Sequence, residues 1–158
     1  MLSRACQIGL RSMLYLTSRS GAAFVNAKEI SQVLGESPHF VAKVLHQLAA
    51  GGLLHSYRGP NGGVALIRRP ESITLSEVVD LIDGANSVDR CLLGKKECSS
   101  ENPCMLHHEW GPIKANLLDM LQTRSLRDIA DQAGPMTKFM NAIPAPASNL
   151  RQKTPKTA

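Results

Sequence analysis

A cysteine-rich stretch near the middle of the chain, CLLGKKECSSENPCMLHHEW, contains the residues best suited to chemistry. Its candidate ligands are Cys91, Cys98, Cys104 and His107. Thiolates favour soft metals and iron–sulfur clusters, and an imidazole can replace a thiolate on an iron atom. Three thiols and an imidazole within seventeen residues could therefore converge on one metal centre.

The spacing of these residues leaves the kind of centre open. The pattern Cys-x6-Cys-x5-Cys-x2-His contains none of the tight cysteine pairs that are typical of structural zinc sites. Open spacing on a loop favours an iron–sulfur cluster, with a zinc ion and a thiol–disulfide switch as alternatives. The Cys-x-x-His turn favours His107 over His108 as the fourth ligand. Cys6, which lies far from this stretch, is expected to be a small buried side chain in the first helix.

Length and composition describe a small globular protein. The 158 residues suffice for one domain with an oligomerising extension; 43% are hydrophobic, but only six are aromatic. The chain has no long apolar run and no signal-peptide pattern, so we expect a cytoplasmic protein that does not bind membranes. In a reducing compartment, cysteines serve as ligands or redox groups more often than as structural disulfides.

The distribution of charge indicates where a polyanion would bind. Residues 1–69 carry eight Lys and Arg against two Glu, a net charge of +6, whereas residues 70–133 carry six basic residues against eleven acidic ones, a net charge of −5. Residues 134–158 add four basic residues and no acidic ones. Nucleic acid is therefore expected to bind the N-terminal part of the chain.

The N-terminal part has the pattern of a helix-turn-helix. Apolar periodicity predicts a first helix over about residues 3–18. Asn26 and Glu29 have the spacing of a capping box, and they open a short second helix that ends at Gly35. A third helix over residues 37–50 begins with Ser-Pro, a good N-cap followed by a residue preorganised for the first helical position. Two helices separated by a short turn, the second one longer, are typical of this motif.

A basic hairpin directly after the third helix is predicted to be the wing of a winged helix. LLHSYR and VALIRR are strand-like runs, and the intervening GPNGG makes a turn. This turn is not a phosphate-binding loop, because no Gly-Lys-Ser/Thr follows it. Arg58 before the turn, Asn61 within it, and Arg68 and Arg69 after the second strand suit contact with phosphates or the minor groove.

The outer face of the third helix is the predicted DNA-reading surface. His39, Lys43 and His46 lie opposite its apolar stripe, and Lys43 and His39 could meet base edges or phosphates. An ordinary solvated helix face is the competing interpretation for each residue taken singly. The complete set of predicted DNA contacts is Lys28, Ser37, Pro38, His39, Lys43, His46, Arg58, Asn61 and Arg68.

The second half of the chain is predicted to contain a helix, a loop and a longer helix. A Thr-x-x-Glu capping box at 74–77 opens a helix that ends at Gly84. Residues 85–108 lack periodicity and carry the thiols, and a loop of this length in a compact domain is usually functional or disordered. The pattern is helical again from about Glu109, which predicts a dimerisation helix and then a short helix capped by Ser125.

The predicted fold class is mainly α with a small β-hairpin wing. Residues 1–84 form a winged helix-turn-helix DNA-binding domain, and residues 85–108 form the cysteine-bearing cluster loop. Residues 109–133 form a long C-terminal dimerisation helix and a short return helix. Residues 134–158, which are rich in Pro, Ala, Ser and Lys, are expected to be a disordered tail.

This ordered set of motifs resembles the Rrf-two family of bacterial winged-helix transcription regulators, in its IscR-like and NsrR-like iron–sulfur type. The matching segments are LSRACQIGLRSMLYL, RGPNGGVAL, ITLSEVVDLIDG and the thiol loop followed by Trp110, over about residues 1–132. The resemblance implies a homodimer that binds a double-stranded DNA operator. It also implies an iron–sulfur cluster, 2Fe–2S in preference to 4Fe–4S, with the ligands Cys91, Cys98, Cys104 and His107.

Two positions depart from the family pattern. Gln7 stands where some members have an acidic ligand for the partner subunit's cluster, which disfavours that arrangement here. The adjacent Cys6 leaves a ligand from the other subunit open. Ala42 replaces a Glu that takes part in operator discrimination, so the operator preferences of the family do not transfer to this chain.

The sequence thus predicts a dimeric, sequence-specific DNA-binding regulator, expected to be a repressor, that senses redox, nitric oxide or iron–sulfur status through the cluster. A zinc-bound or thiol-switched regulator without a cluster is the alternative. An iron–sulfur electron-transfer protein is disfavoured, because it would need no basic wing. The chain has no nucleophile elbow, no His-Glu-x-x-His and no dinucleotide glycine pattern, so neither an enzyme nor a small-molecule substrate is expected.

Overall fold

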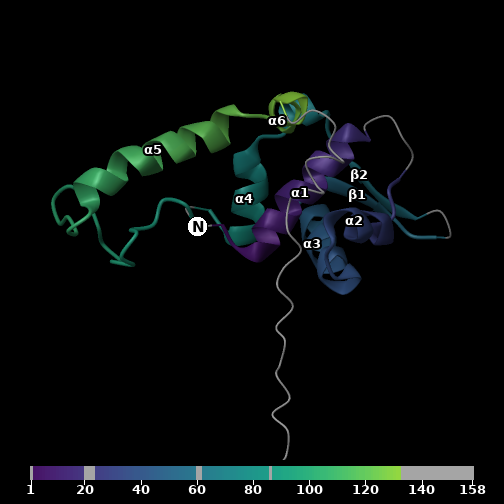
Figure 1. The fold of residues 1–158 in the computed structure, drawn as a ribbon, viewed down its shortest axis with the longest axis horizontal. Helices are drawn as coiled ribbons and strands as arrows, with labels where there is room; N and C mark the ends of the chain where they lie inside the picture. The colour runs from purple at the N-terminus through teal and green to yellow at the C-terminus, as the bar shows by residue number, and fades with distance from the viewer. Residues whose placement is uncertain (1, 20–23, 60–61, 86, 133–158) are drawn as a thin grey trace, which may run out of the picture.

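A computed structural model of the chain describes residues 2–19, 24–59, 62–85 and 87–132 (Figure 1). Its helices and strands are α1 (Arg4–Ser18), α2 (Ala27–Leu34), α3 (Pro38–Ala50), β1 (Leu54–Tyr57), β2 (Gly63–Leu66), the 3-10 turn η1 (Pro70–Ser72), α4 (Leu75–Asp83), α5 (His107–Thr123) and α6 (Leu126–Gln132). The prediction of a mainly helical fold with one hairpin is confirmed. Asn61 and the predicted disordered tail, residues 134–158, lie outside the described residues.

Local hydrogen bonds explain where α2 begins and ends. The Asn26 side chain accepts a hydrogen bond from the Lys28 backbone N–H at 2.8 Å, and Gly35 ends the helix in the left-handed conformation, with φ of 66°. The predicted capping box does not form, because the Asn26 side chain caps the N–H of Lys28 and not that of Glu29. The Glu29 carboxylate accepts a hydrogen bond from the Tyr15 hydroxyl at 2.7 Å instead, and thereby ties α2 to α1.

Helix α3 begins at Pro38, as predicted, but Ser37 does not cap it. Ser37 occupies the N-cap position, yet its side chain makes no capping hydrogen bond. The fixed φ of proline and the burial of one apolar face therefore define the start of α3. This buried face consists of Val41, Val44, Leu45 and Leu48.

One aliphatic core holds the winged-helix unit together, and α1 lies at its centre. Helices α2, α3, α4 and α6 all pack against α1. The side chains that lose all contact with solvent include Ile8, Ile30, Leu48, Ile73 and Leu126. Full burial of such a side chain stabilises the fold by roughly 1.5–3 kcal/mol.

The predicted wing is an antiparallel hairpin in which Leu54 of β1 lies opposite Leu66 of β2. Val25, just before α2, forms a β-bridge with Val64 through two hydrogen bonds of 2.9 Å. The bridge fixes the hairpin to the helix-turn-helix. Figure 1 shows the hairpin and the thiol loop at opposite ends of the subunit.

Helices α4 and α6 begin at the predicted capping residues, whereas α5 begins earlier than predicted. The Thr74–Glu77 capping box is present in both directions, and the Ser125 side chain accepts a hydrogen bond from the Asp128 backbone N–H at 3.1 Å. Helix α5 begins at His107, two residues before the predicted start, because a turn on Cys104 continues directly into the helix. Among the described helices, none combines the length and the hydropathy that a membrane span requires.

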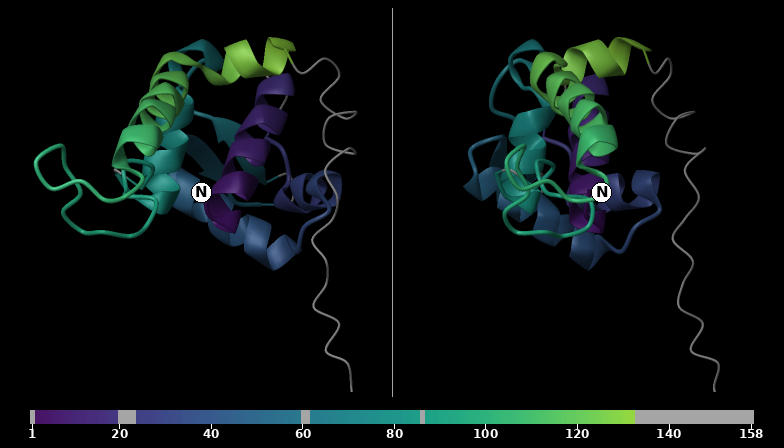
Figure 2. Two further views of the ribbon diagram at one scale, coloured as in Figure 1. Left: turned by 60° about the vertical axis from the view of Figure 1, so that its left-hand side comes forward. Right: turned by 90° about the vertical axis from the view of Figure 1, so that its left-hand side faces the viewer.

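Figures 1 and 2 show that α5 extends away from the core and lies against α4. Leu121, near the C-terminal end of α5, is the one fully buried residue of this helix. Most of α5 therefore presents its side chains to solvent in the single subunit.

Truncation of a core residue in α3 tests this account of stability. We expect Leu48→Ala to lower the free energy of unfolding by about 2–5 kcal/mol, because Leu48 is 0% exposed and a cavity would remain. The matched control is Leu93→Ala, whose side chain is 56% exposed, with an expected change within about 0.5 kcal/mol. Urea denaturation of the metal-free protein measures both, and equal losses would contradict the assigned core.

Candidate metal centre

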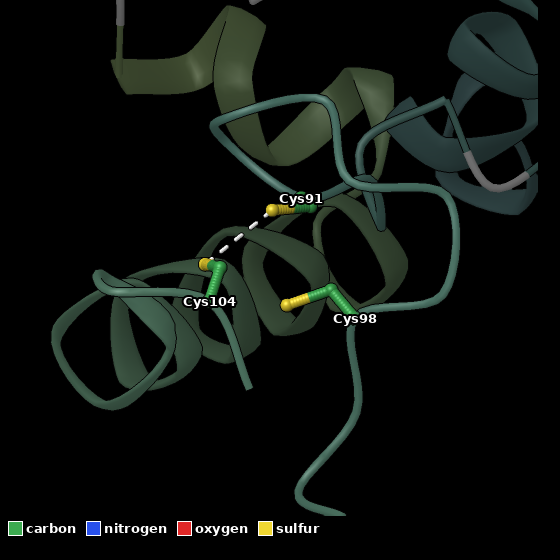
Figure 3. Close-up of side chains that lie close together, drawn as sticks. All are labelled: Cys91, Cys98 and Cys104. Atoms are coloured by element: carbon green, nitrogen blue, oxygen red, sulfur yellow. Dashed lines mark hydrogen bonds between the residues drawn. The ribbon is translucent and has the colours of Figure 1, made fainter. Parts of the chain in front are cut away.

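The side chains of Cys91, Cys98 and Cys104 converge beside the start of α5 (Figure 3). Their sulfur atoms all lie within 4.8 Å of one another, and the Sγ atoms of Cys91 and Cys104 are 3.5 Å apart. All three residues are partly exposed, and none is in a disulfide. Within the described ranges, no other group of three His, Cys, Asp or Glu side chains lies close enough to hold a metal ion.

His107 joins this group through Cys98. Its Nδ1 atom lies 3.2 Å from the Cys98 Sγ atom. The His108 ring lies edge-on to His107, with the ring centroids 5.7 Å apart, and is exposed. The four predicted donors therefore form two close pairs, Cys91 with Cys104 and Cys98 with His107.

Two backbone turns bring the thiols together although the loop has no regular secondary structure. The Gly94 N–H donates to the Cys91 carbonyl at 2.9 Å, and Gly94 has a φ of 74°, which glycine adopts without strain. Ser99 and Asn102 exchange backbone hydrogen bonds of 3.2 and 3.4 Å. Cys98 lies between the two turns, so both turns direct the chain back toward the first thiol.

Lys95 links the two turns. Its Nζ atom donates to the carbonyl and the side-chain oxygen of Asn102, at 2.9 and 2.6 Å, and to the Pro103 carbonyl at 3.4 Å. Three acceptors match the three N–H groups of an ammonium group. Sequence reasoning missed this role, because nothing in the spacing of a lysine and an asparagine indicates it.

Two polar contacts anchor the loop on α5. The Trp110 indole N–H donates to the Arg90 carbonyl at 3.1 Å, and the Lys114 Nζ atom lies 2.7 Å from a carboxylate oxygen of Asp89. Both contacts hold the residues directly before Cys91. From the sequence, Trp110 served only as a marker of family resemblance, and the role of Lys114 was missed. A half-buried indole N–H needs an acceptor, and this need was the signal that could have indicated the role of Trp110.

The thiols differ in acidity. Desolvation raises the pKa of Cys91. Hydrogen bonds from the backbone N–H groups of Lys95 and Leu93 and from the thiols of Cys104 and Cys98 have a larger, opposite effect, and the resulting pKa is about 7. For Cys104, a backbone N–H lowers the pKa, while desolvation and the two neighbouring thiols raise it above the usual range. A thiolate at neutral pH is therefore most favoured at Cys91, and the thiolate is the metal-binding form.

Cys6 is separate from this group. Its side chain is 0% exposed within α1. Desolvation raises its pKa to about 12, and the charge and hydrogen bonding of Asp83 contribute to the rise. This environment agrees with the expectation of a small buried side chain, whereas the adjacent Gln7 is exposed.

The predicted DNA contacts lie on the outer surface of the winged-helix unit. The described members of the set are all exposed: Lys28, Ser37, Pro38, His39, Lys43, His46, Arg58 and Arg68. Arg68 differs from the others, because its guanidinium contacts the Glu77 carboxylate and donates to the Ser72 carbonyl at 3.0 Å. Part of its charge is thus balanced within the protein. The role of these residues in DNA binding stays a prediction.

Comparison with known proteins identifies relatives over almost the whole described chain. Residues 2–132 match the model of the Rrf2 family, which is described as an iron-dependent transcriptional regulator. An HTH-type transcriptional regulator of Aquifex aeolicus is 34% identical over 107 residues, which are 66% of this chain and 74% of that protein. The HTH-type transcriptional regulator NsrR of Bacillus licheniformis is 29% identical over 129 residues, 81% of this chain and 90% of that protein.

Solved structures share the fold. The global cysteine regulator CymR of B. subtilis superposes with a TM-score of 0.71 at 24% identity, over 84% of this chain and 97% of that one. IscR of T. potens superposes with a TM-score of 0.65 at 23% identity, over 84% of this chain and 88% of that one. The helices and the hairpin described above therefore match the winged-helix architecture of these regulators.

Alkylation of the metal-free protein tests the order of thiol acidity. Iodoacetamide reacts with thiolates, so modification of Cys91 should rise with pH and be half-maximal at about pH 7. Cys104, whose pKa is raised, should require a higher pH than Cys91, and buried Cys6 should stay unmodified in the folded protein. Peptide mass spectrometry measures each site, and equal rates for Cys91 and Cys104 at pH 7 would contradict the assigned environments.

Proposed function

Because the chain belongs to the Rrf2 family of iron-dependent transcriptional regulators, we propose that it is a homodimeric repressor whose operator affinity follows the state of an iron–sulfur cluster. The observation that carries this proposal is the convergence of three thiols on one partly exposed loop, with the Nδ1 atom of His107, at the start of α5, 3.2 Å from the Cys98 Sγ atom. Iron dependence is part of the family's description, and the donor set is one that iron accepts.

The donors fit a two-iron cluster. Such a cluster needs two protein ligands on each iron, and an imidazole can replace a thiolate there. The pairs Cys91–Cys104 and Cys98–His107, with separations of 3.5 and 3.2 Å, supply that number. The remaining thiol, Cys6, is buried in α1 and lies outside this group.

Two alternatives share the same residues. A tetrahedral zinc ion with bonds of about 2.3 Å to sulfur would hold its sulfurs about 3.8 Å apart, so three sulfurs within 4.8 Å also suit one zinc ion. The Cys91 and Cys104 sulfurs, 3.5 Å apart, are also near enough to form a disulfide after a small rotation. The likeness to CymR, a cysteine regulator, supports such a thiol switch. Iron dependence of the family favours the cluster.

DNA binding is assigned to α3 and the hairpin. A recognition helix reads base edges in the major groove while a wing contacts the backbone or the minor groove. Lys43 on α3 and Arg58 beyond β1 are exposed and form no ion pair among the described residues. The net charge of +6 over residues 1–69 supports this placement.

Dimerisation is assigned to α5. The helix leaves Ile113 57% exposed and Met120 42% exposed, and Leu106 directly before it is 38% exposed. A second copy of α5 would cover these apolar side chains and would place two recognition helices on two operator half-sites. The shared interface then fixes the spacing of the two DNA-reading units.

The thiol loop, which is the proposed sensor, is attached directly to α5, the proposed dimerisation helix. When bound, the cluster supplies a centre that responds to oxidation, nitric oxide or iron supply. Trp110 and Lys114 tie the residues before Cys91 to α5, so a rearranged loop would shift α5 and the spacing of the DNA-reading units. Coupling between two such sites is typically about 1–3 kcal/mol, a 5- to 150-fold change in affinity.

Metal analysis of anaerobically purified protein tests the cluster. We expect a coloured protein that contains both iron and acid-labile sulfide, and Cys98→Ala should lose most of both. The matched control is Cys6→Ala, which should keep them, since Cys6 lies outside the thiol group. Colourless wild-type protein without iron and sulfide would refute the cluster, and one zinc ion per chain would support the zinc alternative.

The salt dependence of DNA binding tests the wing. On DNA fragments selected by the wild-type protein, Arg58→Gln should weaken binding for all sequences and lower the log–log salt slope by about 1 for each lost phosphate contact. The control is Arg127→Gln on α6, whose guanidinium lies 3.3 Å from Glu71. Fluorescence anisotropy at several salt concentrations measures both slopes, and an unchanged slope for Arg58→Gln would remove this residue from the interface.

A further inference from the structure

The last turn of α4, residues 81–83, is the point where the thiol loop leaves the winged-helix unit. Gly84 ends the helix with a φ of 91°, and Cys91 follows seven residues later. Helices α1 and α3 both contact this turn. Figure 2 also shows α4 between the loop and the rest of the winged-helix unit.

Helix α3 contacts the turn through Gln47. The Gln47 Nε2 atom donates to the Leu81 carbonyl at 3.0 Å and lies 3.4 Å from the Ile82 carbonyl. Carbonyls in the last turn of a helix have no partner within the helix, so this amide supplies one. Gly51, at the end of α3, has no space for a Cβ atom, because the Leu81 side chain occupies that position. The two helices are therefore joined by a hydrogen bond and by close packing.

Helix α1 holds the other side of the same turn. The Ser3 backbone N–H donates to the Asp83 carboxylate at 2.8 Å, and its hydroxyl contacts the second carboxylate oxygen. Gly9 packs against Ile82, again without space for a Cβ atom. Three consecutive residues of α4 are thus held by α1 and α3, and a displacement of this turn has to move at least one of them.

We propose that Gln47 is a positioning residue that transmits the state of the thiol loop to the recognition helix within one subunit. This inference rests on the proposed function, and it adds a second route to the change in dimer spacing. A rearranged loop would pull on the last turn of α4, and the Gln47 hydrogen bonds would carry the shift into α3. The tilt of α3 on its own half-site then depends on the sensor, even when the spacing between subunits is constant.

Variants of Gln47 separate this role from simple helix capping. Gln47→Glu has the same size but no N–H donor at neutral pH and repels the carbonyls, and Gln47→Leu removes the donor without adding charge. Gln47→Lys keeps a donor and suits a helix C-terminus, so it is the conservative rescue. Measurements of iron content, sulfide content and thermal unfolding check that each variant retains its cluster and its fold.

The measured quantity is the ratio of operator affinities between the anaerobic cluster-loaded protein and the same protein after removal of iron. The expected wild-type ratio lies within about 5- to 150-fold. We expect Gln47→Glu and Gln47→Leu to reduce this ratio at least about threefold, and Gln47→Lys to preserve it. A direct effect of a variant on DNA contact cancels in this ratio where it is the same in both states.

Hydrogen exchange distinguishes transmission through Gln47 from a purely structural role, because a purely structural role would not change the difference in amide exchange between the two states. In the wild-type protein, amide exchange in α3 should differ between the loaded and iron-free states, and in Gln47→Leu this difference should vanish. A large wild-type ratio that persists in both Gln47→Glu and Gln47→Leu would overturn the inference and leave the proposed function intact. A wild-type ratio of 1 would refute the proposed function itself.

Discussion

The close packing of α1 against α3 and α4 is the interaction on which the rest of the molecule depends. Ile8 and Met13 of α1 are fully buried, and Gly9 lets α4 approach so closely that Ile82 fills the space of a missing side chain. This packing aligns the recognition helix and the hairpin as one unit. It also fixes where the chain emerges at Gly84 to form the thiol loop.

The thiol loop is held by a different kind of interaction. Between Gly84 and α5 no described side chain is fully buried, and the loop depends on polar contacts from Lys95, Trp110 and Lys114. Segments with few buried apolar contacts open at low free-energy cost. The sensor proposed above would benefit from this arrangement, because a change at the thiols would alter the loop without unfolding the winged-helix unit.

The exposed positive charges of the winged-helix unit and the exposed apolar side chains of α5 lie on different parts of the subunit. Helix α3 and the hairpin, which carry the exposed Lys43 and Arg58, lie toward one side of the subunit, while the thiol loop and the start of α5 lie at the other (Figure 1). Any effect of the sensor on DNA must therefore cross the subunit or act through a second copy. We propose the last turn of α4 as the first route and the exposed face of α5 as the second.

The features that the sequence by itself determined are those that depend only on residues close together along the chain. Helix starts at Asn26, Thr74 and Ser125 and the hairpin could be predicted, because caps, turns and periodicity act over a few residues. The role of the candidate ligands stays a prediction. The loop anchors and the Gln47 contact with α4 join distant segments, and the pairing of Cys98 with His107 depends on the irregular path of the loop, so only the tertiary structure decided them. The same reason explains the two caps that failed: Glu29 found a partner on α1, and packing set the start of α3 without the Ser37 side chain.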